Sequence, residues 1–301
     1  MSERIAVGVD AGGTSTVAAM SRDGAYESSA REGPANPSSV GVPAAVETIA
    51  TAVRELVGDV DPAALFVAVA GAGRVHVRDA FEAALRAAFP ETPALAVEDD
   101  TRVALRAALP QGPGVVLIAG TGSVAFGENG EVRARVGGAG YLAGDEGSAF
   151  AIGMAAVRLL LRAYDGRGRA DETTALAARV LDAHDRDALL DALYGAPLDV
   201  AKIASMAPSI IAFAGKGNRA STKIVQGAAQ ELGDLVRAAV RQCGLTDASP
   251  AVVFAGGLLR ENSLLTFLLE TRVGNEVPGA NVVRLRDEPA RAALRFAEAL
   301  A

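Results

Sequence analysis

Three segments of the sequence place glycine directly after a short apolar run. Glycine lets the backbone turn tightly, and without a Cβ its N–H groups can approach a phosphate closely. The segments are Asp10-Ala11-Gly12-Gly13-Thr14, Gly120-Thr121-Gly122-Ser123 and Gly256-Gly257. Each alone is also typical of a plain hairpin turn. Their recurrence favours phosphate binding, because the first two begin roughly 110 residues apart, about the length of one domain.

This recurrence predicts a nucleotide site. Two such loops in equivalent lobes would face each other across a cleft and hold a polyphosphate from both sides. Asp10, at the end of its strand, can hold Mg²⁺ directly or through water. Thr14 adds a hydroxyl, and Gly256-Gly257 would support an adenosine. Other nucleotide motifs are excluded, because the one Gly-Lys pair does not complete a P-loop and the segment after Gly120 reads as a strand.

The surrounding pattern alternates strands and helices, which predicts an α/β fold with parallel pairings. Residues 5–30 read as three strands joined by turns, and residues 115–136 repeat that pattern. Residues 33–39 read as a loop, residues 262–270 as a helix, and residues 289–300 as a terminal helix with Pro289 at its start. We expect lobes over 1–111 and 112–301, the second with a helical insertion over about 150–245, and the helix at 289–301 can pack back on the first lobe.

The composition of the chain excludes several classes of protein. The chain has 301 residues, 50% of them hydrophobic, and a net charge of −7, which offers no basic surface for nucleic acid or anionic lipid. Cys243 is the one cysteine, so an internal disulfide or a cysteine-based cluster within one chain is excluded. The first residues show no secretory pattern, and no apolar run reaches about 18 residues. We expect a cytoplasmic protein without a membrane span or a nucleic-acid partner.

Taken together and in this order, the motifs resemble those of the sugar kinase–actin–chaperone ATPase superfamily, over essentially the whole chain. Gly144-Asp145-Glu146-Gly147-Ser148, after Gly137-Gly138, is similar to the N-acetylglucosamine kinase branch, which includes the BadF/BadG/BcrA/BcrD activator ATPases. The resemblance implies two ribonuclease H-like lobes in a duplicated, actin-like ATPase fold. It further implies ATP and Mg²⁺ as cofactors, a small amino sugar as substrate, and a homodimer.

The resemblance also implies roles for individual residues. Asp100 matches the catalytic aspartate, a base for the attacking sugar hydroxyl, although Asp99 and Asp100 are equally typical of a helix cap and first-turn acid. The nucleotide and phosphate would be bound by Asp10, Gly12, Gly13, Thr14, Gly120, Thr121, Gly122, Ser123, Gly256 and Gly257. The sugar would be bound by Asn36, Asp100, Thr121, Gly138, Asp145 and Glu146.

The expected function is therefore ATP-dependent phosphorylation of an N-acetylglucosamine- or glucosamine-type hexose, at its 6-hydroxyl. Two alternatives stay open: an ATPase that activates a CoA-ester reductase or dehydratase, which the single cysteine disfavours, and a non-catalytic sugar or nucleotide sensor. Ala139 stands where animal N-acetylglucosamine kinases have Trp, which weakens the inference to N-acetylglucosamine itself. The terminal segment from Pro289 also lacks a glycine usual in that family.

Overall fold

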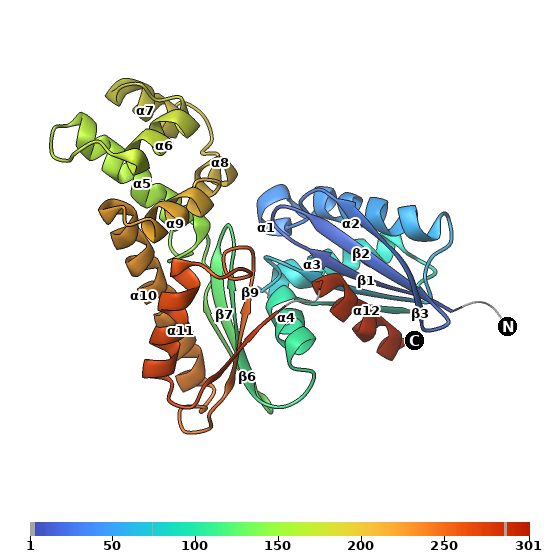
Figure 1. The fold of residues 1–301 in the computed structure, drawn as a ribbon. Coiled ribbons are helices and arrows are strands. Elements are labelled where there is room, and N and C mark those ends of the chain that lie inside the picture. Colours follow the sequence, from blue (N-terminus) through green and yellow to red (C-terminus); the bar gives the residue numbers. More distant parts are fainter. Residues whose placement is uncertain (1–3, 74, 286–287) are drawn as a thin grey trace. The chain divides into compact units, whose positions relative to one another are not determined.

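The computed structural model describes residues 4–73, 75–285 and 288–301, as a mixed α/β fold with two five-stranded sheets (Figure 1). The chain divides into two compact units. Unit 1 comprises Met1–Pro110 and Arg286–Ala301, and unit 2 comprises Gln111–Leu285. No helix in the described ranges is long and apolar enough to cross a membrane.

The sheet of unit 1 has the order β3-β2-β1-β4-β5. Strands β1 to β3 form the expected antiparallel meander, whereas β4 and β5 run parallel to β1. Ala11 pairs with Val69 and Val69 with Asp99, so the three parallel strands end at one edge. The strands are β1 (Ile5–Ala11), β2 (Thr16–Arg22), β3 (Ala25–Glu32), β4 (Ala64–Val69) and β5 (Ala94–Asp99).

The described residues of unit 1 also form helices α1 (Pro37–Val40), α2 (Val42–Val57), α3 (Val75–Ala88), α4 (Asp100–Ala108) and α12 (Pro289–Leu300). The prediction of a loop over residues 33–39 was wrong at its end. Asn36 caps α1 by accepting a hydrogen bond from the Ser38 N–H at 2.8 Å, and Pro37 supplies a helical φ at the first position. Helix α12 belongs to unit 1, where Phe296 stacks on Phe66 with ring centroids 5.0 Å apart.

The sheet of unit 2 has the order β10-β9-β6-β7-β8. Strands β6 to β8 form a second antiparallel meander, and β9 and β10 run parallel to β6. This is the same arrangement as in unit 1. The strands are β6 (Gly114–Ala119), β7 (Ser123–Asn129), β8 (Val132–Gly137), β9 (Ala251–Ala255) and β10 (Asn281–Arg284).

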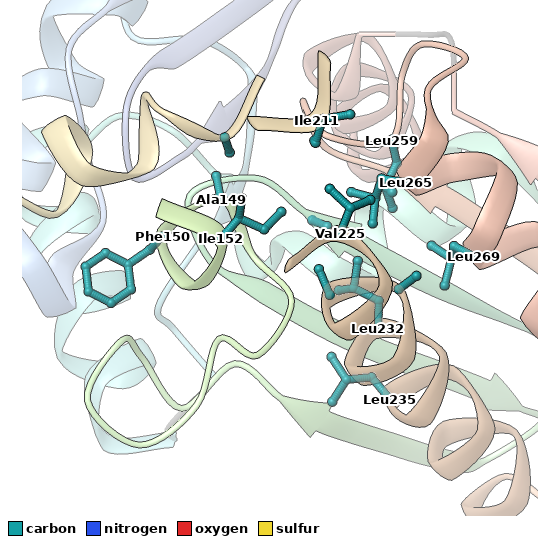
Figure 2. Packing of buried hydrophobic residues seen from close by; sticks show 14 of the residues in the cluster. Ala149, Phe150, Ile152, Ile211, Val225, Leu232, Leu235, Leu259, Leu265 and Leu269 are labelled. Atoms are coloured by element: carbon teal, nitrogen blue, oxygen red, sulfur yellow. The ribbon is translucent and has the colours of Figure 1, made fainter. Parts of the chain in front are cut away.

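A run of helices lies between β8 and β9 in the sequence: α5 (Ala149–Tyr164), α6 (Glu172–Leu181), α7 (Arg186–Tyr194), α8 (Val200–Ala204), α9 (Ala207–Gly215) and α10 (Arg219–Gln242). Helix α11 (Leu264–Glu276) starts and ends later than the predicted 262–270, because Ser263 and Thr266 form a capping box at its start. Figure 2 shows Ile152 of α5, Val225 and Leu232 of α10, and Leu265 of α11 in one apolar cluster.

Candidate functional site

The loop between β1 and β2 is a tight turn with outward-facing backbone. The N–H of Gly12 donates to the carbonyl oxygen of Ser15 at 2.9 Å and closes the turn. Within the described part of the chain, the next two N–H groups, of Gly13 and Thr14, donate to no protein group, and both residues are exposed. Two adjacent free donors in a turn can bind an anion.

Asn36 lies at the same edge of the unit 1 sheet as this turn. The N–H of Ala35 donates to the Gly12 carbonyl at 3.1 Å. The Asn36 side chain lies over Gly71, in the loop after β4, where a Cβ would come within 2.1 Å of its Oδ1. Gly71 also has a φ of +83°. Only glycine therefore leaves room for Asn36 in this position.

The adjacent acids Asp99 and Asp100 differ in position. Asp99 ends β5 and is the N-cap of α4, because its Oδ1 accepts a hydrogen bond from the Thr101 N–H at 3.0 Å, and another from the Thr101 hydroxyl. Asp100 is the first residue of the helix itself and is half-buried. The capping role thus falls to Asp99, whose carboxylate is turned to its own helix.

The register of the parallel strands brings the unit 1 residues to one edge. Asp10 and the following turn leave β1, Gly71 follows β4, and Asp99 ends β5. Neighbouring strands lie about 4.8 Å apart, so β1 and β5 are separated by about 10 Å at this edge. Asp10, the Gly12–Thr14 turn, Asn36 and Asp100 therefore share one edge of one sheet.

The loop between β6 and β7 resembles the turn of unit 1 but is one residue shorter, because Ala119 pairs with Ser123 where Ala11 pairs with Thr16. The N–H of Gly120 donates to the Gly122 carbonyl at 2.9 Å. The following N–H groups, of Thr121 and Gly122, donate to no protein group among the residues described. Two first-turn N–H groups of α5 hold the loop from behind: Ala149 donates to the Gly120 carbonyl at 2.8 Å and Phe150 to that of Thr121 at 3.2 Å.

Ser123 is tied to the Gly144–Ser148 segment rather than exposed. It is 3% exposed, its N–H donates to Asp145 Oδ1 at 3.2 Å, and its hydroxyl donates to the Glu146 carbonyl at 2.6 Å. Burial raises the pKa of the Asp145 carboxyl, as does the charge of Glu146, whereas the Ser123 N–H and Arg135 act to lower this pKa. Asp145 has a φ of +58°, a conformation that Asp and Asn tolerate better than most residues.

Gly256 and Gly138 are also adjacent to this loop. A Cβ on Gly256 would lie 2.3 Å from the Ala119 carbonyl oxygen, and the N–H of Leu258 donates to that oxygen at 3.1 Å. Gly257 is exposed. Gly138 lies over Val124 at the start of β7. Unit 2 thus brings together Gly120, Thr121, Gly122, Ser123, Gly138, Asp145, Glu146, Gly256 and Gly257.

Sequence reasoning did not find two features of these sites: the hydrogen bonds of Ser123 and the role of Gly71. The hydrogen bonds from Ser123 to residues 145 and 146 join segments more than 20 positions apart, and no local pattern reveals them. Gly71 follows the apolar strand β4. A glycine in this place is the sequence signal that could have pointed to the loop beside Asn36. Tyr141 and Phe150 contact each other edge to face, with ring centroids 5.3 Å apart, beside the same segment.

Comparisons with known proteins identify the family of the chain and its relatives. A family model, the BadF/BadG/BcrA/BcrD ATPase family, matches residues 7–294. An N-acetylmuramic acid/N-acetylglucosamine kinase of Clostridium acetobutylicum is 30% identical over 188 residues, 61% of this chain and 60% of that protein. An N-acetyl-D-glucosamine kinase of Dictyostelium discoideum is 30% identical over 187 residues, 61% and 59% of the two chains. The alignments thus span about 60% of these relatives.

Solved structures share the fold. A proposed N-acetylglucosamine kinase from Chromobacterium violaceum has a TM-score of 0.76 and 23% identity, covering 97% of this chain and 98% of that one. A ROK family glucokinase from Streptomyces griseus, solved with glucose and AMPPNP, has a TM-score of 0.59 and 17% identity, covering 98% and 99%. At these identities the likeness is one of fold.

Proposed function

Because the chain belongs to the BadF/BadG/BcrA/BcrD ATPase family, we propose that it is an ATP-dependent amino-sugar kinase that phosphorylates the 6-hydroxyl. The observation that carries this proposal is the pair of like turns after β1 and β6. In each turn the first glycine closes the loop, and the next two N–H groups are left without a protein partner among the described residues. Such donors suit the phosphates of a nucleotide.

In this proposal the backbone carries most of the nucleotide binding. Gly13, Thr14, Thr121 and Gly122 donate to phosphate oxygens, and Gly12, Gly120 and Ser123 hold the turns in shape. The exposed Gly257, with Gly256 packed against Ala119, supports the adenosine. Stabilising the charge on the transferred group with fixed donors is the main requirement of phosphoryl transfer.

The acidic groups present fit a Mg²⁺ ion that arrives with ATP. No cluster of three or more His, Cys, Asp or Glu side chains that could hold a metal occurs among the described residues. Mg²⁺ in such enzymes is held by one or two carboxylates, waters and the substrate phosphates. Asp10 would supply its carboxylate at the end of β1, and the ion would neutralise charge on the phosphates.

We assign Asp100 as the general base. A carboxylate can accept the proton of the 6-hydroxyl while that oxygen attacks the γ-phosphorus and the bond to ADP breaks. Asn36 and Asp100 share one sheet edge, which supports a sugar beside them. Thr121, Gly138, Asp145 and Glu146 are the further candidates for its hydroxyl and amide groups.

We further propose that the two units are duplicated ribonuclease H-like lobes of an actin-like ATPase fold. The identical arrangement of strands in the two sheets supports this assignment. Helices α5 to α10, between β8 and β9, are then an insertion in the second lobe. A cytoplasmic homodimer without a nucleic-acid or membrane partner remains our expectation.

The buried cysteine argues against the alternative of an activator ATPase. Such proteins share an iron–sulfur cluster held by cysteines between subunits. Cys243 is 2% exposed and packs over Gly127, where a Cβ would come within 2.6 Å of its sulfur. Burial also raises the pKa of the Cys243 thiol. A buried thiol with a raised pKa is poorly placed to ligate a cluster at a subunit surface.

A coupled assay of ADP release tests the proposed function. We expect ADP release to depend on added sugar, with N-acetylglucosamine, glucosamine, N-acetylmuramic acid and glucose compared at equal concentration. Phosphorus NMR of the product would show a phosphate on the 6-position. Equal ADP release without sugar would instead indicate an ATPase, and nucleotide binding without turnover on any sugar would indicate a sensor.

A further inference from the structure

Unit 2 contains a large cavity, and among its described lining residues Glu146 is the one that the proposed reaction also uses. Its volume is about 910 Å³, and it lies between α5, α10 and the segment before α6. Ile152, Leu159 and Ile224 form apolar parts of its wall. Pockets for small ligands are of this size and of this mixed apolar and polar character.

Four cationic side chains line this cavity: Arg158, Arg169, Arg219 and Lys223. Among the residues that the structure describes, none of the four has an acidic partner or a side-chain hydrogen bond. The protein as a whole carries a net charge of −7. Four unpaired cations around one cavity of an acidic protein favour an anionic ligand.

The cations gather at one end of the cavity. Gly147, just before α5, lies against Ala228 and Leu232 of α10. Beyond the far end of α5, the Thr173 hydroxyl hydrogen-bonds with that of Ser221, near the start of α10, at 2.8 Å, so the two helices run in opposite directions. The far part of α5, with Arg158, therefore lies toward the start of α10, with Arg219 and Lys223. The Asp171 carboxylate is also there, but it accepts hydrogen bonds from two N–H groups and from Asn218.

The other end of the cavity is acidic. Glu231 lies eight residues beyond Lys223 on α10, which is about 12 Å along the helix axis. Glu146, beside Gly147, lines the same end. Neither side chain pairs with a cation among the described residues. The cavity thus has an unpaired cationic end, an apolar wall and an acidic end.

From this polarity we infer that the cavity binds an organic phosphate whose far end carries hydroxyl or ammonium groups. The phosphate lies among Arg158, Arg169, Arg219 and Lys223, and the donors of the far end face Glu231 and Glu146. Since Glu146 adjoins Ser123 and the β6–β7 loop, a ligand here contacts the segment that holds that loop. The cationic end of this site does not depend on the proposed kinase reaction, whereas Glu146 is shared with the proposed sugar site.

Calorimetric titration of the full chain with glycerol 3-phosphate, a hydroxyl-bearing organic phosphate that the proposed reaction does not form, tests this inference. Glycerol and inorganic phosphate, each one part of the probe, are expected to bind at least about tenfold more weakly. In the double variant Arg219→Gln/Lys223→Gln, we expect the Kd for the probe to rise about tenfold or more, because bonds to charged groups are lost. The matched control is Lys202→Gln, an exposed lysine on α8 outside the cavity.

The inference is overturned if the double variant, folded by circular dichroism, binds the probe as the wild type does. It is also overturned if no binding is detected. A second copy of this chain is the alternative occupant of the cavity. Analytical ultracentrifugation of the wild type and the double variant tests for it by measuring their oligomeric states. A dimer that dissociates in the double variant, with unchanged affinity for the probe, would make the cavity an interface between copies.

Discussion

The adjacent residues Asp99 and Asp100 at the start of α4 have the same side chain but different structural positions. The Asp99 carboxylate accepts hydrogen bonds from the N–H and the hydroxyl of Thr101. A capping carboxylate is turned to its own backbone, whereas the first helical residue projects from the helix. Asp99 is therefore the helix cap, and Asp100 remains our proposed base, a choice that the sequence could make only by resemblance.

Asp100→Asn is expected to lower kcat by about 10²–10⁴-fold, because the amide cannot accept the proton. Asn keeps the shape of the side chain, so the affinity for sugar should change much less than kcat. Single-turnover kinetics and equilibrium sugar binding measure the two effects.

Asp99→Asn is the control, since Asn is a good helix cap. We expect it to retain activity. Loss of activity in Asp99→Asn with activity kept in Asp100→Asn would transfer the base to Asp99, and full activity in both would refute a carboxylate base here.

Asp145→Asn should raise the melting temperature at pH 7. Burial raises the pKa of Asp145 above its ordinary value of 3.8. Between 3.8 and the raised pKa, the folded chain binds the proton more tightly than the unfolded chain, so the free energy of unfolding falls as the pH rises. Above that range the folded chain bears the full free-energy cost of burying the ionised Asp145 carboxylate. The neutral Asn side chain does not have this cost.

Thermal unfolding of both proteins from pH 7 to pH 4 checks this prediction. The advantage of Asp145→Asn should shrink as the pH falls toward 3.8. An advantage that is independent of pH would show that the carboxylate charge is not its cause. In the proposed function the same change weakens sugar binding, which would explain why the aspartate is present at a cost in stability.

The start of α5 holds the β6–β7 loop in unit 2. The first N–H groups of a helix have no partner within it. In α5 two of them bind the carbonyls of the β6–β7 loop, which orients that loop without any side chain. Helix α10 is different, because its first turn has no acidic residue and begins with Arg219, and Lys223 follows one turn later.

Arg219→Glu is expected to increase the free energy of unfolding by about 0.3–1 kcal/mol. A cation in the first turn opposes the helix dipole, and an anion there is favourable. Urea unfolding at low ionic strength measures the change, which added salt should reduce. Lys202→Glu on α8 is the control, because it changes the net charge of the protein by the same amount without altering the first turn of α10. A destabilised Arg219→Glu variant would mean that Arg219 makes a structural contact.

At the scale of the whole chain, the C-terminal helix completes the core of unit 1. Ala290, Ala293, Leu294 and Ala297 of α12 are buried. A Cβ on Gly8, in the middle of β1, would lie 1.9 Å from the backbone nitrogen of Leu294. Helix and strand backbones are therefore in direct contact, although some 280 residues separate them in sequence.

Gly8→Ala should destabilise the protein by about 1–3 kcal/mol or more, because the added methyl group overlaps backbone that cannot move without undocking α12. Gly13→Ala is the matched control, since a Cβ there meets no heavy atom within 4 Å. Denaturant unfolding of both variants tests the prediction. Equal stabilities would show that α12 does not dock on β1 in solution.

The sequence by itself determined the two three-strand meanders, the alternation of strands and helices, and the turns within the meanders. Local chemistry decides these features: apolar runs of strand length, glycine where the chain must turn, and proline at the start of a helix. The presence of parallel pairings also followed, because strands that alternate with helices must cross over, and the structure pairs β1 with β4 and β4 with β5. Predicted boundaries failed where capping decides them, at Asn36 and Ser263.

Only the tertiary structure decided which of these residues meet. Among the described residues the turn amides of Gly13 and Thr14 have no protein acceptor, whereas Ser123, a predicted phosphate ligand, donates to Asp145 and Glu146. The docking of α12 on Gly8 and the cavity between α5 and α10 likewise join segments that are distant in sequence. Such contacts depend on packing and on which donors remain unpaired, and both are properties of the folded chain that no local pattern of residues encodes.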